Sequence, residues 1–378
     1  MPATYRAAVI GHTGRGNYGH GLDTVWQRLD NVEIVGVADP DPAGLKAAQE
    51  RLETSAGYPS YHQMLRETEP DVVSICPRWL DQHQEMLIAC ARAGVRGVYC
   101  EKPLCRSLAE ADVMVDAAQA TGMKVAVAHQ TRYSPKLTQV RELIESGKIG
   151  RPLEFRARGK EDRRGGGEDL WVLGTHVLNL THYFGGEPSW CSAHVFQGDQ
   201  PIHQGHVQDG SEGIGPLAGD RLHALYGLNG GAVASFNSVR HQNTNPSRFG
   251  LMIYGSEGII AMNTGYLPHV SWLPDGSWTP ARTQAQWIPV SSQGPGQPEI
   301  LEDGGLHAGN RLACTDLIRA IEDEREPEAS LLEARVAVEM IAGVFESHRQ
   351  NRPVSIPLQQ RDNPLSLLPT MSEQGSTY

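Results

Sequence analysis

The chain has 378 residues, of which 39% are hydrophobic and 20% charged, with a formal net charge of −11 and an isoelectric point of about 5.7. This acidic balance argues against nucleic acid or an anionic membrane as a main partner, and no apolar run approaches the roughly 20 residues that cross a bilayer. The length exceeds what one compact core usually serves, so we expect two domains.

The cysteines and the N-terminus indicate the compartment. The six cysteines show neither CxxC spacing nor a disulfide-like framework. The first residues lead almost directly into a strand, which leaves no room for a signal peptide. We therefore expect reduced thiols in a cytoplasmic protein.

The first predicted elements are a strand, a glycine-rich turn, a helix and a second strand. They cover residues 7–10, 11–19 (GHTGRGNYG), 22–29 and 32–38. In dinucleotide-binding units the glycines of such a turn let backbone amides approach a pyrophosphate at a helix N-terminus. The alternative is a glycine-rich loop in an α/β domain that binds no nucleotide.

The spacing within and after this turn favours NAD over NADP. Gly14, Gly16 and Gly19 fit G-x-G-x-x-G, although Gly11 is an equally good first glycine. Asp39 ends the second strand about 20 residues past the turn, where a carboxylate accepts hydrogen bonds from the adenosine ribose. Neither an arginine nor a lysine stands beside it to hold a 2′-phosphate.

Helices and strands continue to alternate up to about residue 130. Helical patterns cover 45–52, 61–66, 82–93 and 108–121, and strand patterns cover 71–76, 98–100 and 124–128. Strands separated by helices of this length predict a parallel sheet. We therefore expect a doubly wound Rossmann domain at residues 1–130.

The strand at 98–100 ends in Glu101, Lys102 and Pro103. Charged residues at the end of an apolar strand are costly unless they are paired or put to use. Because ligands of doubly wound sheets bind at the carboxyl ends of the strands, we expect Lys102 where a cofactor and a substrate meet. The alternative is a surface Glu–Lys pair.

The C-terminal half, residues 131–358, has a different pattern. Strand-like alternation at 153–158, 190–196, 222–228, 232–239, 249–254 and 259–262 predicts an α+β domain with a large, mostly antiparallel open sheet. Amphipathic helices at 310–322 and 332–348 are expected to cover one face of it. Residues 359–378 form a polar tail that is either disordered or an arm across a partner.

These motifs resemble the Gfo/Idh/MocA family of oxidoreductases, which includes glucose-fructose oxidoreductase and inositol dehydrogenase. The resemblance rests on the glycine turn, the segment 71–77 with His83 beyond it, Glu101-Lys102-Pro103 and the segment 132–135. It continues through the glycines 165–167, the segment 174–176, the turn 255–258 and the ending 354–358. It therefore spans nearly the whole chain.

The resemblance implies a cofactor, a subunit contact and catalytic residues. The cofactor is NAD, Lys102 and His176 serve in proton transfer, and the C-terminal sheet meets a second subunit in a homodimer or homotetramer. An ammonium beside a positively charged nicotinamide should have a lowered pKa and act as a base near neutral pH. The expected cofactor contacts are Gly11, Thr13, Gly14, Arg15, Gly16, Asn17, Asp39, Cys76, Pro77, His83, Glu101, Lys102 and Arg132. For His83, a capping or packing role is the alternative.

One family motif is only partly present. The family pattern Asp-x-Gly-x-His-x-x-Asp is matched by Gly174 and His176, whereas Val172 and Asn179 replace the two acids. The standard acid–base assignment is therefore in doubt, and Glu168 or Asp169 are alternative carboxylates. A histidine at a helix start should have a depressed pKa and stay neutral, although it could instead cap the helix.

The segment 156–164, which precedes this motif, is rich in lysine and arginine. It could hold a carboxylate, phosphate or sulfonate of a substrate, or it could be a solvated charge run. The expected substrate contacts are Lys102, Lys160, Arg163, Arg164, Glu168, Asp169, Trp171, Val172, His176 and Asn179. No metal site is expected, because the histidines lack ligand spacing.

The sequence thus predicts a carbohydrate-metabolism enzyme that moves a hydride between a secondary hydroxyl of a sugar, cyclitol or glycoside and NAD. Two alternatives stay open. One is a glycosidase that uses tightly bound NAD for transient oxidation and elimination. The other is a regulator that binds NAD and sugar without catalysis, for which loss of the family acid is a point in favour.

Overall fold

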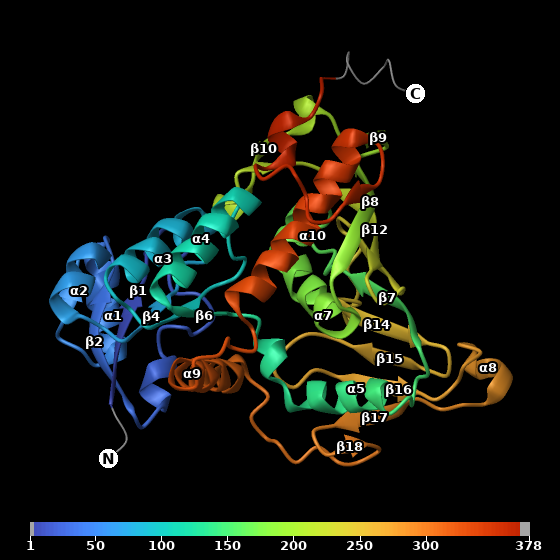
Figure 1. Ribbon diagram of the computed structural model, residues 1–378, viewed down its shortest axis with the longest axis horizontal. Coiled ribbons are helices and arrows are strands. Elements are labelled where there is room, and N and C mark those ends of the chain that lie inside the picture. The colour runs from blue at the N-terminus through green and yellow to red at the C-terminus, as the bar shows by residue number, and fades with distance from the viewer. Residues whose placement is uncertain (1–3, 371–378) are drawn as a thin grey trace. The chain divides into compact units, whose positions relative to one another are not determined.

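The computed structural model describes residues 4–370 (Figure 1). These residues divide into two compact units. The first contains residues 4–133, Glu212–Ile214 and Gly305–Arg335, and the second contains Ser134–Ser211, Gly215–Gly304 and residues 336–370. Within residues 4–370, no helix is both long enough and apolar enough to span a membrane.

The first unit contains a six-stranded sheet in which every pair of neighbouring strands is parallel. The strand order is β3-β2-β1-β4-β5-β6, which confirms the predicted doubly wound sheet. The order reverses between β1 and β4, and such a reversal is where ligands of this fold bind. The strands are β1 Tyr5–Ile10, β2 Val32–Ala38, β3 Gly57–Tyr58, β4 Val72–Ile75, β5 Gly97–Cys100 and β6 Lys124–Val127.

The helix predicted at 22–29 is wrong in type and length. Residues 20–24 form turns, and only η1, Val25–Arg28, is helical, as a single 3₁₀ turn. The glycine-rich turn is therefore not followed by the α-helix N-terminus expected there. The other helices of this unit are α1 Pro42–Leu52, α2 Tyr61–Thr68, η2 Leu80–Gln82, α3 His83–Arg92, α4 Leu108–Thr121, η3 Gln130–Tyr133 and α9 Leu306–Glu322.

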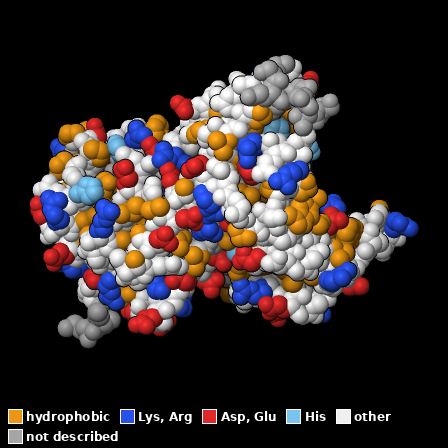
Figure 2. All heavy atoms as spheres, turned by 45° about the horizontal axis from the view of Figure 1, so that its top comes forward, with side chains coloured by type: hydrophobic (Ala, Val, Ile, Leu, Met, Phe, Trp, Pro, Cys, Tyr) orange, Lys and Arg blue, Asp and Glu red, His pale blue; other side chains and the backbone are white. Residues whose placement is uncertain are grey.

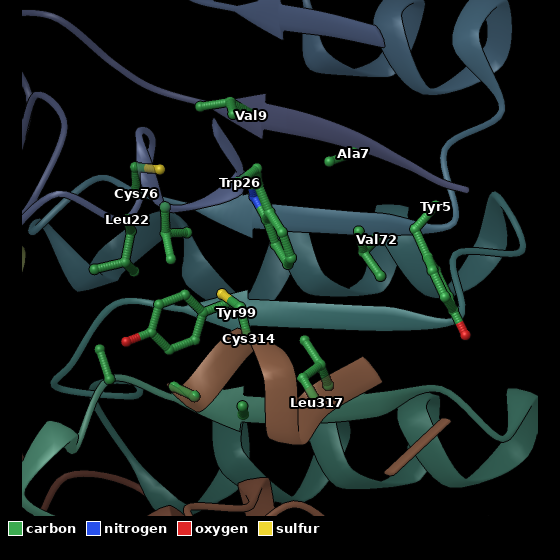
Figure 3. Close-up of a cluster of buried hydrophobic side chains, with 14 of the residues drawn as sticks. Tyr5, Ala7, Val9, Leu22, Trp26, Val72, Cys76, Tyr99, Cys314 and Leu317 are labelled. Atoms are coloured by element: carbon green, nitrogen blue, oxygen red, sulfur yellow. The ribbon is translucent and has the colours of Figure 1, made fainter. Parts of the chain in front are cut away.

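Helix α9 belongs to the first unit, so the prediction that it covers the antiparallel sheet is wrong. Its apolar face, which includes Cys314 and Leu317, joins a buried cluster with Trp26, Val72 and Tyr99 (Figure 3). The amphipathic pattern identified the helix and its buried face. The pattern could not identify the sheet that the face meets, because periodicity carries no information about the partner.

The second unit is built on an eleven-stranded sheet that confirms the predicted open, mostly antiparallel architecture. Its order is β18-β17-β16-β15-β14-β7-β13-β12-β8-β19, with β9 paired to β8, and only β7 and β13 run parallel. The strands are β7 Pro152–Arg158, β8 Pro188–Gln197, β9 Gln200–Pro201, β12 Arg221–Leu228, β13 Val233–Val239, β14 Gly250–Gly255, β15 Ile259–Met262, β16 Val270–Leu273, β17 Ile288–Ser291, β18 Gly294–Pro295 and β19 Val354–Ser355. The strands β10 Gln208–Asp209 and β11 Pro216–Leu217 form a separate pair.

Helix α10, Leu331–Gln350, packs against this sheet as predicted. The Tyr226 hydroxyl of β12 donates to the Met340 carbonyl, and the Ala193 amide of β8 donates to the Ser347 hydroxyl. The other helices of this unit are α5 Pro135–Glu145, α6 Gly167–Asp169, η4 Leu170–Gly174, α7 Thr175–Gly185, η5 Gln204–His206, α8 Pro280–Thr283 and η7 Pro364–Leu367. Residues of η6, Ser211–Gly213, are divided between the two units. Glu212 within η6 has non-helical backbone angles.

The described part of the predicted tail, residues 359–370, packs on the second unit. Leu365 and Leu368 are buried, and the Pro369 carbonyl accepts from the Gln204 amide. Residues 371–378 of that tail lie outside the described residues.

The position of α9 generates a stability prediction. Leu317→Ala removes a fully buried side chain from the cluster below the parallel sheet, and we expect it to cost about 2–5 kcal/mol of unfolding free energy. Leu306→Ala on the same helix removes a side chain that is 44% exposed, and it should cost far less. Thermal unfolding of both variants checks this, and equal losses would contradict the placement of α9.

Candidate functional site

The candidate cofactor site lies in the first unit, at the carboxyl ends of the parallel strands. The loops that follow β1, β2, β4, β5 and β6 all emerge at this edge of the sheet. Every predicted cofactor contact belongs to this unit, and most of them lie in these loops.

The glycine loop after β1 is shaped by two glycines with positive φ, Gly14 (+79°) and Gly16 (+92°). A Cβ on Gly16 would lie 2.6 Å from the Trp79 backbone nitrogen, whereas a Cβ on Gly14 would meet nothing within 4 Å. Asn17 closes the turn, because its side-chain oxygen accepts from the Gly14 amide at 2.9 Å. Gly11 leaves room for the Tyr18 ring, which a Cβ there would overlap. The loop therefore needs glycine at 16 for close approach of two backbones.

This loop is fastened to the loop after β4. Arg15 forms an ion pair with Asp81 and lies 5.1 Å from the centre of the Trp79 ring. His12 contacts the Gln82 side chain at 2.7 Å, and the Arg78 amide donates to the Gly16 carbonyl at 3.2 Å. The predicted contact Arg15 thus has a protein partner already and fixes the loop to its neighbour.

Asp39 is 1% exposed at the end of β2, and its carboxylate is held by the glycine loop. It accepts from the Thr13 amide at 3.0 and 3.1 Å, from the Thr13 hydroxyl at 2.7 Å and from the Asp41 amide at 2.9 Å. A carboxylate offers about four acceptor positions, so a ribose hydroxyl would share Asp39 with Thr13. The negative charge of Asp39 disfavours a 2′-phosphate at this place.

Cys76, Pro77 and His83 connect β4 to the neighbouring loops. The Cys76 side chain is part of the buried cluster, and its carbonyl accepts from the Gly19 amide at 2.8 Å. His83 is fully buried, with Nε2 2.7 Å from the Pro77 carbonyl and Nδ1 3.0 Å from the Leu104 carbonyl. His83 therefore ties the loop after β4 to the loop after β5.

Glu101 and Lys102 follow β5 and are 0% and 7% exposed. One Glu101 oxygen accepts from the Lys102 amide at 2.5 Å, and the other contacts His20 Nδ1. Burial opposes ionisation of Glu101, but the hydrogen bond and charge of His20 and the charge of Lys102 outweigh it and lower the pKa of the carboxyl. The buried Glu101 is therefore an anion between the glycine loop and Lys102.

His129 and Arg132 follow β6. Burial, together with the positive charges of Arg132 and Lys102, lowers the pKa of His129 to about 3, so its ring is neutral near pH 7. Arg132 donates to Glu333 at 2.8 Å and is buried. The predicted cofactor contact Arg132 thus pairs with the start of α10 inside the first unit.

In the second unit His176 does not stand at a helix start, which corrects the argument for its pKa. The helical run begins at Gly167, passes through the π-helical turn η4 and continues into α7 without a break in helical backbone angles. His176 is therefore more than two turns inside the run, where the helix dipole is weak. Trp171, Val172 and Asn179 of the same run are buried, and His176 is half-buried.

The two alternative carboxylates in this unit differ in their surroundings. Asp169 is fully buried and accepts from the Lys160 amide, the Glu161 amide and, at 2.6 Å, the Ser238 hydroxyl. Burial raises the pKa of Asp169 although these donors oppose the shift. Asp169 thus connects the loop after β7 to β13, whereas Glu168 is half-buried and accepts from Ser211 at 2.6 Å.

In the cation-rich segment 156–164, basic side chains pair with acidic side chains of the same segment. Arg164 makes two hydrogen bonds to Asp162 through its guanidinium, and Lys160 lies 3.8 Å from the same carboxylate. Arg158 pairs in the same way with Glu161. Arg163 is exposed. Arg158 and Arg164 are thus paired with acids of their own segment, one of which, Glu161, is buried.

Three residues of the first unit were missed by the sequence reasoning: His20, His129 and Asn310. His20 stands between two glycines of the loop, His129 directly follows a strand, and Asn310 is a polar residue on the buried face of α9. His129 and Asn310 are buried polar residues, which need partners, whereas His20 is exposed and gives no such signal. The partners themselves come from distant parts of the chain.

The surface carries no large field of one sign on the face drawn in Figure 2, where cationic and anionic side chains are interspersed. Within residues 4–370, no group of three or more His, Cys, Asp or Glu side chains is placed to hold a metal ion. All six cysteines are buried free thiols.

Two family models match the chain. One is described as an oxidoreductase family with an NAD-binding Rossmann fold and matches residues 5–129, and the other as the C-terminal alpha/beta domain of that oxidoreductase family and matches residues 141–356. NAD is thus confirmed as the cofactor of this kind of domain. The loop with its glycine at 16 and Asp39 fit that cofactor.

Characterised relatives are similar over part of their length. Levoglucosan dehydrogenase of Pseudarthrobacter phenanthrenivorans is 27% identical over 61% of this chain and 64% of that protein. Myo-inositol 2-dehydrogenase of Thermotoga maritima is 26% identical over 46% of this chain and 51% of that protein. The chain thus matches less than two thirds of the length of either relative.

Solved structures share the fold. Levoglucosan dehydrogenase in complex with NADH and L-sorbose has a TM-score of 0.74 at 20% identity, covering 94% of this chain and 99% of that one. An oxidoreductase domain protein from Kribbella flavida has a TM-score of 0.74 at 23% identity, covering 95% of this chain and 100% of that one.

A pair of alanine variants tests the shape of the glycine loop. Gly16→Ala strains a positive φ and drives a methyl group into the backbone at Trp79, so we expect weaker NAD binding and a stability loss above about 3 kcal/mol. Gly14→Ala has the strain of a positive φ alone, which costs about 1–2 kcal/mol. Calorimetric NAD titration and thermal unfolding measure both effects, and a Gly14→Ala variant as damaged as Gly16→Ala would argue against this account.

The neutral, buried His129 predicts acid sensitivity. Its pKa is about 3 in the fold against an ordinary 6.5, so as the pH falls from about 6.5 the unfolded chain takes up a proton that the folded chain refuses. Stability from this residue is therefore complete above pH 6.5 and declines by about 1.4 kcal/mol per pH unit below it.

His129→Gln removes this titration. We expect its thermal midpoint to fall less than that of the unmodified protein between about pH 7.5 and pH 5. His62→Gln replaces an exposed histidine of the same unit and should leave the pH dependence unchanged. Parallel pH curves for the unmodified and His129→Gln proteins would rule out the assignment.

Proposed function

This chain belongs to the Gfo/Idh/MocA family of oxidoreductases, and we propose that it transfers a hydride between a secondary hydroxyl of a sugar, cyclitol or glycoside and NAD. Lys102 and His176 move the hydroxyl proton. The observation that carries the proposal is the placement of Lys102: a buried lysine at the carboxyl end of β5, anchored through Glu101 to the loop that the cofactor needs.

The chemistry follows from which groups can take a proton. NAD supplies the hydride acceptor or donor when it is bound. Oxidation of a secondary alcohol also releases the hydroxyl proton, which needs a base at that oxygen. Val172 offers only a hydrocarbon where the family carries an acid, so Lys102 and His176 are the bases that we propose.

The substrate class rests on the relatives. Levoglucosan dehydrogenase and myo-inositol 2-dehydrogenase are named for an anhydrosugar and a cyclitol, both of which present ring secondary hydroxyls. Trp171, Asn179 and Glu168, together with the exposed Lys160 and Arg163, are the substrate contacts that we propose in the second unit. A cytoplasmic role in carbohydrate metabolism and a homodimer or homotetramer through the large sheet complete the proposal.

A substrate panel tests the function. The purified protein is incubated with NAD and, in turn, levoglucosan, myo-inositol and simple glycosides, and the near-ultraviolet absorbance of NADH is followed. We expect NADH to form in proportion to a ketone product with at least one of them. Cleavage of a glycoside without net NADH would favour the glycosidase instead. Calorimetric binding of NAD and sugar with no product would favour the regulator.

Two variants test the bases. Lys102→Ala should lower kcat by about 10²–10⁴-fold, the usual contribution of a positioned base, while NAD affinity measured by calorimetry changes little. His176→Ala should lower kcat in the same direction. Lys46→Ala, an exposed lysine on α1, is the matched control and should leave kcat unchanged. A Lys102→Ala variant with full activity would contradict the assignment of Lys102 as a base.

A further inference from the structure

A histidine of the glycine loop reaches the strand two places away in the sheet. His20 Nδ1 contacts one oxygen of Glu101, which follows β5, while His20 itself follows β1, and β4 separates these two strands. The backbone at His20 is in the left-handed region, with φ +45° between Gly19 and Gly21. A Cβ on Gly19 would lie 2.6 Å from the same Glu101 oxygen, so glycine there lets the carboxylate reach the loop.

The second oxygen of Glu101 holds the main chain of the next residue. It accepts from the Lys102 amide at 2.5 Å, a short hydrogen bond to a charged acceptor. Because the Glu101 side chain is fully buried, water does not compete for either oxygen. The carboxylate therefore joins His20 on one side to the backbone of Lys102 on the other.

His20, at the loop end of this connection, is itself held in place by other residues. The Asn310 side-chain amide of α9 donates to the His20 carbonyl at 2.9 Å. Its oxygen accepts from the Tyr99 hydroxyl of β5 at 2.8 Å and from the Gln130 side chain at 3.1 Å. Asn310 is fully buried, so these partners fix the position of His20 relative to β5 and to η3.

We propose that His20 is a positioning residue for Lys102, acting through Glu101 and held in place by Asn310. The inference rests on the proposed function in that Lys102 is the base whose position matters. It goes beyond that function because it couples the cofactor loop to the base: Gly14, Gly16 and His20 belong to one loop, so the loop that we assign to the cofactor also carries the partner of Glu101. His20 does not itself exchange a proton with substrate.

The test uses a signal that needs no substrate. The chain has six lysines, so protein labelled with [¹⁵N]lysine gives one backbone amide signal for each of Lys46, Lys102, Lys124, Lys136, Lys148 and Lys160. Loss of one signal in Lys102→Arg assigns it. The Lys102 amide proton should lie far downfield, because it donates a short hydrogen bond to a carboxylate.

Two substitutions that are isosteric with each other test the side-chain donor at position 20 without changing the backbone there. Asparagine and aspartate both tolerate the left-handed region, so each keeps the backbone at position 20. His20→Asn offers an amide donor near the place of Nδ1, and we expect the Lys102 signal to stay close to its original position. His20→Asp offers no donor, and the signal should move upfield by several linewidths. His20→Gly, which also accepts the left-handed backbone, is the second donor-less variant should His20→Asp not fold, and His62→Asn is the control.

An activity arm separates this inference from the proposed function. With any substrate found active, kcat at saturating NAD should fall about 100-fold in His20→Asp, the usual loss for a catalytic group displaced by about 1 Å, and recover in His20→Asn. An unmoved Lys102 signal in the donor-less variants, or an equal displacement in His20→Asn, would overturn the inference even if the enzyme is active. The expected shifts without turnover of any substrate would leave the positioning role standing and count against the proposed function.

Discussion

The structure of the candidate site depends on one buried charge, the carboxylate of Glu101. A buried carboxylate needs hydrogen-bond donors, because the free-energy cost of removing its charge from water is large when no donor replaces the water. Here His20 and the Lys102 amide supply them. That requirement fixes the loop after β1 against the end of β5, and it does so across an intervening strand.

The glycines of the loop follow from the same requirement. Gly16 allows the loop backbone to approach the backbone at Trp79, and Gly19 allows Glu101 to reach the loop. The ion pair between Arg15 and Asp81 joins the glycine loop to the loop after β4. A loop held at so many points is preorganised, so cofactor binding pays little to order it.

The sequence predicted what periodicity and local motifs encode. The parallel sheet, the antiparallel sheet and the strand ending at Cys100 were found, because alternation and strand–helix order are local properties. The assignment of α9 to the parallel sheet was not found, nor were the contacts of Glu101 with His20 and of Asp169 with Ser238, since these join residues that are distant in the chain. The helix start assigned to His176 failed because the π-helical turn carries no composition signal that distinguishes it from a loop.

The residues of the helical run in the second unit bear on the proposed proton transfer. The Asp169 carboxylate accepts from two backbone amides and from the Ser238 hydroxyl, and burial raises its pKa. Val172 has no proton to exchange. In the helical run from Gly167 to Gly185, His176 is half-buried, and its imidazole has one nitrogen that can donate and one that can accept a hydrogen bond when neutral. Our proposal therefore assigns the proton transfer of this unit to the imidazole of His176 rather than to a carboxylate.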